Sequence, residues 1–201
     1  MHLRTSLAAV AGVAAVVAAG LIGLSSSAYA GTGTVTGSFA SGTATYSGAT
    51  YGCTSGSVAG TYDDINNPAL VISSMSISCS TPFGTSTTSL NSCTVPVSLT
   101  GTRTSGIDTA IAGNAVFGTG TCVKVSLLAG LCTFNVQGTV AATFNETTKV
   151  VGGVTYQDLI LNGSGTIANQ SPNCFGFYSG SFTLNNIAFN IAAAGGPINF
   201  V

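Results

Sequence analysis

The sequence predicts an all-β domain, either a β-sandwich or a small antiparallel β-barrel of about nine strands, stapled by disulfides. Glycine, serine and threonine are dense throughout the chain, and no window after residue 30 shows a helical period. Apolar residues alternate with polar ones in short runs, which is the strand pattern. The six cysteines all follow residue 30, and an even number in an exported chain indicates three disulfides.

The first 30 residues have the order of a secretory signal peptide. Arg4 precedes an uncharged apolar run over residues 7–24, and Ala28-Tyr29-Ala30 supplies the small residues of a cleavage site. The run is long enough to span a bilayer, so a retained anchor is the alternative, but the cleavage site favours removal. We therefore expect cleavage between Ala30 and Gly31. Residues 31–201 would then form a single β domain, secreted or extracellular, with association with the cell wall as a further option.

Strands are expected along most of this domain. Residues 34–39 and 43–51 predict an opening hairpin around Ser41-Gly42. In the next strand Val71, Met75, Ile77 and Cys79 share one face. In the one after it, Cys93, Val95, Val97 and Leu99 share a face, and Pro96 on the opposite side suggests an edge strand.

The clearest pair of strands lies between residues 122 and 144, around a two-residue turn at Ala129-Gly130. This turn places Leu127 opposite Cys132, Val125 opposite Phe134 and Val123 opposite Val136, whereas a one-residue slip would bury Lys124. Cys122 and Cys132 then fall on opposite faces and are not opposed, so they make a poor disulfide.

The alternation changes phase close to the C-terminus. Phe182 and Leu184 are in one phase, whereas Ile187, Phe189 and Ile191 are in the other. A bulge or tight turn is therefore expected at Asn185-Asn186.

Charged side chains are scarce after residue 30. The basic residues are Arg103, Lys124 and Lys149, and the acidic residues are Asp63, Asp64, Asp108, Glu146 and Asp158. Three cations cannot follow a phosphate backbone, so nucleic acid is excluded as a partner. The only histidine, His2, lies in the signal peptide, which removes histidine-assisted nucleophilic catalysis and histidine-bound zinc.

Two groupings of acidic residues are candidate sites. Asp63-Asp64 with Asn66-Asn67 has the oxygen donors of a calcium loop, but a solvated turn before Pro68 is the favoured interpretation. Asp63 with Asp108, Glu146 or Asp158 would supply the carboxylate pair of a glycosidase, although sequence does not give their separation. We predict no catalytic residue, no metal site and no cofactor.

Several motifs resemble those of a loose group of small secreted actinobacterial proteins without assigned function. They are Ile77-Ser78-Cys79, the run over residues 132–139, Asn145-Glu146-Thr147, Cys174-Phe175-Gly176 and Gly180-Ser181-Phe182. The resemblance covers about the last two-thirds of the chain and implies secretion and a β fold.

The same resemblance implies four family cysteines and an added pair. The implied disulfides are Cys53–Cys79, Cys132–Cys174 and Cys93–Cys122. The third is in tension with the strand pattern, which points Cys93 inward and Cys122 outward.

Three functions remain open from the sequence. The first is a non-enzymatic secreted or cell-surface protein with a structural or interaction role and a cell-wall or surface component as partner. The second is an extracellular carrier of a small apolar ligand inside a closed barrel. The third and weakest is an envelope β-barrel, because the outer face of residues 131–144 is Thr, Asn and Gln rather than an apolar band. The oligomeric state is not indicated.

Overall fold

The computed structural model describes residues 31–63, 69–81, 84–100, 110–176 and 178–200. This part of the chain contains ten strands and two single-turn 3-10 helices. Their bounds are β1 (Thr32–Tyr46), β2 (Ala49–Asp63), β3 (Ala69–Thr81), β4 (Gly84–Leu90), β5 (Val95–Leu99), β6 (Ala110–Phe117), β7 (Val123–Leu127), η1 (Leu128–Gly130), β8 (Cys132–Val151), β9 (Val154–Ala168), η2 (Pro172–Cys174) and β10 (Ser181–Ala193). The expected signal peptide, with Ala30, lies outside the described residues, which begin at Gly31.

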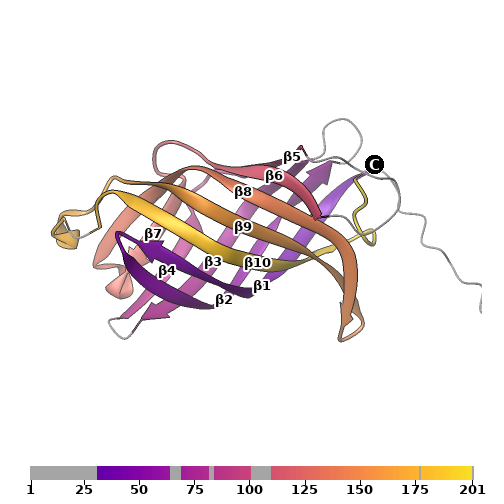
Figure 1. Cartoon of the computed structure of the whole chain (residues 1–201), viewed down its shortest axis with the longest axis horizontal. Coiled ribbons are helices and arrows are strands. Elements are labelled where there is room, and N and C mark those ends of the chain that lie inside the picture. Colours follow the sequence, from indigo (N-terminus) through magenta and orange to yellow (C-terminus); the bar gives the residue numbers. More distant parts are fainter. Residues whose placement is uncertain (1–30, 64–68, 82–83, 101–109, 177, 201) are drawn as a thin grey trace, which may run out of the picture.

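All ten strands belong to one antiparallel sheet that closes on itself (Figure 1). Six strands follow one another around the wall in the order β8, β9, β10, β1, β2 and β3. Two shorter pairs complete the wall between β3 and β8. Strands β4 and β7 do so along one half of the barrel, and β5 and β6 along the other. Each half is therefore a ring of eight strands, so the closed form of the two predicted architectures is the one found.

The two ends of the barrel differ. At the end that we call the tail end, β1 starts, β10 finishes, the β8–β9 turn projects and residues 194–200 follow. At the opposite end, the cap end, the β1–β2 and β7–β8 turns lie together with residues 169–176 and 178–180 of the connection between β9 and β10. Figure 1 shows the β8–β9 turn and the C-terminus toward one end of the long axis and both 3-10 helices toward the other.

The hairpin predicted between residues 122 and 144 is confirmed in register. Leu127 pairs with Cys132, Val125 with Phe134 and Val123 with Val136, and all six side chains are buried. The turn is closed by the Leu131 N–H, which donates to the Leu128 carbonyl at 3.2 Å. The bulge expected at Asn185-Asn186 is also present, as the β9–β10 register shifts between Leu184 and Ile187. Both phases of β10 therefore point into the core.

The opening hairpin was placed wrongly by the sequence. Strand β1 continues through Ser41-Gly42 as an irregularity against β10, and the chain turns at Ser47-Gly48. Gly42 has φ +136°, and a Cβ there would lie 2.5 Å from the Asn186 carbonyl oxygen. The glycine permits close contact between two irregular strands, which sequence alone does not distinguish from a turn.

Two further expectations about strands were wrong. Val71 faces outward, because Ser73 is an extra residue in the β2–β3 ladder and shifts the phase between Ile72 and Met75. Strand β5 is not an edge, since it pairs with β3 on one side and β6 on the other. Proline has no N–H to donate to a neighbouring strand. Pro96 is tolerated in β5 because pairing with β6 begins only at the following residue, Val97.

The three disulfides join Cys53 to Cys79, Cys93 to Cys122 and Cys132 to Cys174. These are the pairings that the resemblance implied. Cys93 and Cys122 lie just before β5 and β7, in the connections rather than the strands. The inward–outward alternation of a strand therefore does not determine where these two side chains point. The tension between this disulfide and the strand pattern is thereby removed. Their bond lies where the two short strand pairs meet, and the Asn91 N–H also donates to the Cys122 carbonyl there at 2.8 Å.

Candidate functional site

The barrel interior is a packed core. The fully buried aromatic side chains include Phe134, Phe144, Phe182, Phe189 and Phe200. The cavity at its centre, lined by side chains such as Met75 and Ile187, has a volume of about 20 Å³. A void of this size holds about one water molecule. This cavity is therefore too small for an apolar ligand.

The tail end of the barrel is closed by the C-terminal segment. Ile198 and Phe200 are each 1% exposed, and the Phe200 ring packs edge-to-face on Phe144 with centroids 5.2 Å apart. Gln157 is buried and pairs with the backbone of Ile198 as another strand would. Its Oε1 accepts from the Ile198 N–H at 2.7 Å, and its Nε2 donates to the Ile198 carbonyl at 2.7 Å. The tail is thus held as a plug, helped by the Glu146 carboxylate, which accepts from the Phe200 N–H at 2.8 Å.

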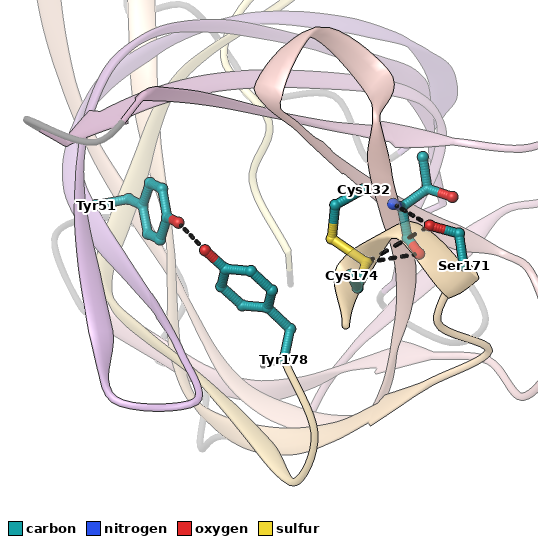
Figure 2. The surroundings of a disulfide bond; sticks show 6 residues. Tyr51, Cys132, Ser171, Cys174 and Tyr178 are labelled. Carbon is teal, nitrogen blue, oxygen red and sulfur yellow. Dashed lines mark hydrogen bonds between the residues drawn. A yellow bond between two sulfur atoms is a disulfide. The ribbon is translucent and has the colours of Figure 1, made fainter. Parts of the chain in front are cut away.

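The cap end is closed by the connection between β9 and β10. Tyr178 points into the barrel, where its hydroxyl lies 2.9 Å from that of Tyr51 (Figure 2). The Tyr178 ring also stacks on Phe134, with the ring centroids 5.5 Å apart. Burial, followed by the hydrogen bond with Tyr178, raises the pKa of Tyr51 well above its usual value. The Cys132–Cys174 disulfide beside them ties this connection to the start of β8. Both mouths are therefore filled by the chain itself.

The acidic residues singled out in the sequence take different places. The Asp158 carboxylate pairs with Lys149 at 2.7 Å, and that of Glu146 binds the tail. Asp63 ends β2 at the tail end. Asp64, Asp108 and the Asn66-Asn67 pair lie outside the described residues. Within the described ranges, no three His, Cys, Asp or Glu side chains gather as they would around a metal ion.

A shallow groove lies on the outer wall at the tail end, across the first three strands. It has a volume of about 390 Å³. Its lining comes from Thr32, Gly33 and Thr34 of β1, Thr61, Tyr62 and Asp63 of β2, and Ala69 and Val71 of β3. Hydroxyl groups, one carboxylate and small apolar side chains therefore share one concave surface. Such a lining can bind a neutral ligand that carries hydroxyl groups.

Sequence reasoning found part of this arrangement. The strand predicted over residues 34–39 contains Thr34, but the groove also needs the register of β1, β2 and β3, which the misplaced hairpin did not provide. The plug was missed altogether. The sequence indicates the plug only through the two apolar residues Ile198 and Phe200, which are spaced as in a strand. Because they follow Gly195-Gly196-Pro197, this segment looks like an unstructured terminus.

Comparison with known proteins gives no relative: no family model matches the chain, and neither a curated protein nor a solved structure was found to be similar to it. In the part of the chain that the structure describes, no helix has the length and apolar character needed to cross a membrane.

Proposed function

We propose that this protein is a non-enzymatic extracellular or cell-surface protein that binds an uncharged, hydroxyl-rich surface component such as cell-wall carbohydrate. The observation that carries the proposal is the filled interior. Because side chains occupy the barrel and chain segments close both mouths, the outer wall and the loops are what remains for recognition.

The chemistry of the outer wall supports this class of partner. Serine, threonine and asparagine dominate the outward positions, as in Thr34 and Thr36 of β1, Ser76 of β3 and Asn114 of β6. Short hydroxyl side chains lose little conformational entropy when a ligand immobilises them. A surface with so few charges has little attraction for polyanions, whereas it can exchange hydrogen bonds with neutral sugars.

The groove is the place on this wall where a ligand would be held. Thr34 and Thr61 are cross-strand partners, and both line the groove. The Asp63 carboxylate accepts hydrogen bonds from sugar hydroxyls, and the aliphatic side chains of Ala69 and Val71 provide the apolar contact that a sugar ring needs.

Binding of the mature protein to purified cell wall of its host, and to neutral polysaccharides released from it, tests the proposal. The double variant Thr34→Val/Thr61→Val removes two hydroxyls and keeps the shape of the groove. Loss of two ligand hydrogen bonds of about 1 kcal/mol each should weaken binding roughly 30-fold.

Thr45→Val/Thr50→Val is the matched control. These residues are also cross-strand partners on β1 and β2, with their hydroxyls 3.0 Å apart, but they lie toward the cap end. The control should bind like the wild type. Equal binding by both variants, or no binding of the wild type to any wall fraction, contradicts the proposal.

A carrier of a small apolar ligand is the second candidate, and the plug is the observation that favours it. The plug follows Gly195-Gly196, and its backbone is held largely by one side chain, Gln157. Displacement of Ile198 and Phe200 would open an apolar mouth. Titration of an environment-sensitive fatty acid probe should then give saturable, one-to-one binding, and its absence counts against the carrier role.

A further inference from the structure

Three large apolar side chains are exposed together at the cap end. Leu128 is 50% exposed, Leu131 64% and Phe175 80%. Leu128 and Leu131 belong to one turn. Leu131 and Phe175 are each the chain neighbour of a cysteine of the same disulfide, whose Cα atoms are 4.7 Å apart. The disulfide therefore holds the backbones of Leu131 and Phe175 near each other at the cap end, and we call the three exposed side chains the cap patch.

The backbone at the cap patch holds these side chains in unusual positions. Leu128 and Phe175 have φ of +51° and +52°, in the left-handed region that large side chains rarely adopt. Ala129 between the two leucines has φ +55°. Strained backbone of this kind persists where the surrounding structure enforces it, and it is concentrated at functional positions. Here the hairpin turn and the disulfide enforce it, and the side chains point away from the core.

Charge is distributed unequally between the two ends. Among the described residues, the charged side chains Asp63, Glu146, Lys149 and Asp158 lie at the tail end, and only Lys124 lies in the cap half. The exposed apolar side chains of the cap end therefore have few charges near them, whereas the exposed valines of the β8–β9 turn lie among the charges of the tail end. Figure 1 shows η1 and η2, which flank the cap patch, toward the end opposite the C-terminus.

We propose that the cap patch inserts into the surface of a lipid layer and orients the barrel end-on, with the groove at the tail end facing away. The patch measures roughly 350 Å², below the roughly 800 Å² per partner of a stable protein interface, so a second copy is the less favoured occupant. A small apolar tip without adjacent charges suits insertion among lipid chains. Because basic residues do not surround it among the described residues, binding should not depend on anionic lipid.

Co-sedimentation with phosphatidylcholine vesicles, and with vesicles that also contain phosphatidylglycerol, tests this proposal. The wild type should bind both kinds equally, and binding should persist in about 0.5 M NaCl because counterions screen only electrostatic attraction. The variant Leu128→Ser/Leu131→Ser/Phe175→Ser should bind at least about 10-fold less, since its apolar area is removed. These side chains are exposed, so thermal unfolding should confirm that the variant folds normally.

The projecting β8–β9 turn provides the matched control. Val150, Val151 and Val154 there are 68%, 59% and 44% exposed, but they lie at the charged tail end. Their triple replacement by serine should leave vesicle binding unchanged.

Four results overturn the proposal. The first is failure of the wild type to bind vesicles, and the second is an equal loss of vesicle binding in the two triple variants. The third is binding restricted to anionic vesicles. The fourth is a dimer that only the cap-patch variant abolishes, while the wild type does not bind vesicles. The last would assign the patch to a second copy of the chain. None of these results depends on the carbohydrate groove, so the two proposals fail separately.

Discussion

Gln157 is the side chain on which closure of the tail end depends most. Its amide makes three hydrogen bonds, two with the backbone of Ile198 and one with the carbonyl of Glu146 at 3.1 Å. Gln157→Leu has a similar volume and cannot make any of them. The buried N–H and carbonyl of Ile198 would both lose their partner.

The size of the effect follows from those two backbone groups. A buried polar group left without a partner costs about 1–3 kcal/mol, so keeping the plug docked in the variant would cost about 4 kcal/mol. Burial of Ile198 and Phe200 contributes about 2–3 kcal/mol each, against the entropy cost of ordering the segment. The cost of the unpartnered backbone groups and the gain from burying the two side chains are therefore of similar size. We therefore expect the tail of the variant to leave the mouth in a large fraction of molecules while the rest of the barrel stays folded.

Hydrogen exchange of the C-terminal peptide, followed by mass spectrometry, measures this directly. The amides of Ile198 and Phe200 should be protected in the wild type and exchange rapidly in Gln157→Leu. Asn162→Leu is the matched control, because this amide side chain on the same strand makes two hydrogen bonds with Asn186 at the surface, where water can replace them. Equal protection of the tail in the wild type and Gln157→Leu would refute the role assigned to Gln157.

Two further predictions concern stability. Replacing Cys93 and Cys122 together by alanine should lower the free energy of unfolding by about 3–4 kcal/mol, measured in urea titrations. The reason is that their bond closes a loop of 29 residues and joins the two short strand pairs. A loss below about 1 kcal/mol would contradict this. Stability should also fall as the pH rises above about 10. Burial raises the pKa of Tyr46 above 10.0, so the unfolded chain loses that proton first, and the slope should reach about 1.4 kcal/mol per pH unit for this residue. Tyr46→Phe should reduce the slope by this amount and leave the contribution of Tyr51, whose pKa is also raised by burial, and an unchanged slope would refute the assignment.

Local patterns predicted those parts of the fold that depend on a single hairpin. The β7–β8 register was predictable because a slip would bury Lys124, and the β10 bulge because its two apolar phases meet at Asn185-Asn186. The closed ring was not predictable, since closure depends on pairing between β2 and β3 and on both β3 and β8 changing partners midway.

The errors came from glycine and serine residues that have no strong local preference. Gly42 looked like a turn and is part of an irregular strand, while Ser73 looked like an ordinary strand residue and is a bulge. The plug could not be predicted for a related reason. A polar strand residue such as Gln157 and a short apolar segment after two glycines become partners only when the barrel brings them together.

Native mass spectrometry of the protein taken from the culture medium of its own host tests the central claim most directly. The claim is that this is an exported, three-disulfide barrel whose interior is filled by its own chain. We predict a mass that begins at Gly31 and is six hydrogens below the reduced chain, the same under native and denaturing conditions. An apolar small molecule retained in the native spectrum and lost on denaturation would contradict the filled interior, whereas a retained carbohydrate would fit the outer groove. An uncleaved N-terminus or free thiols would contradict export.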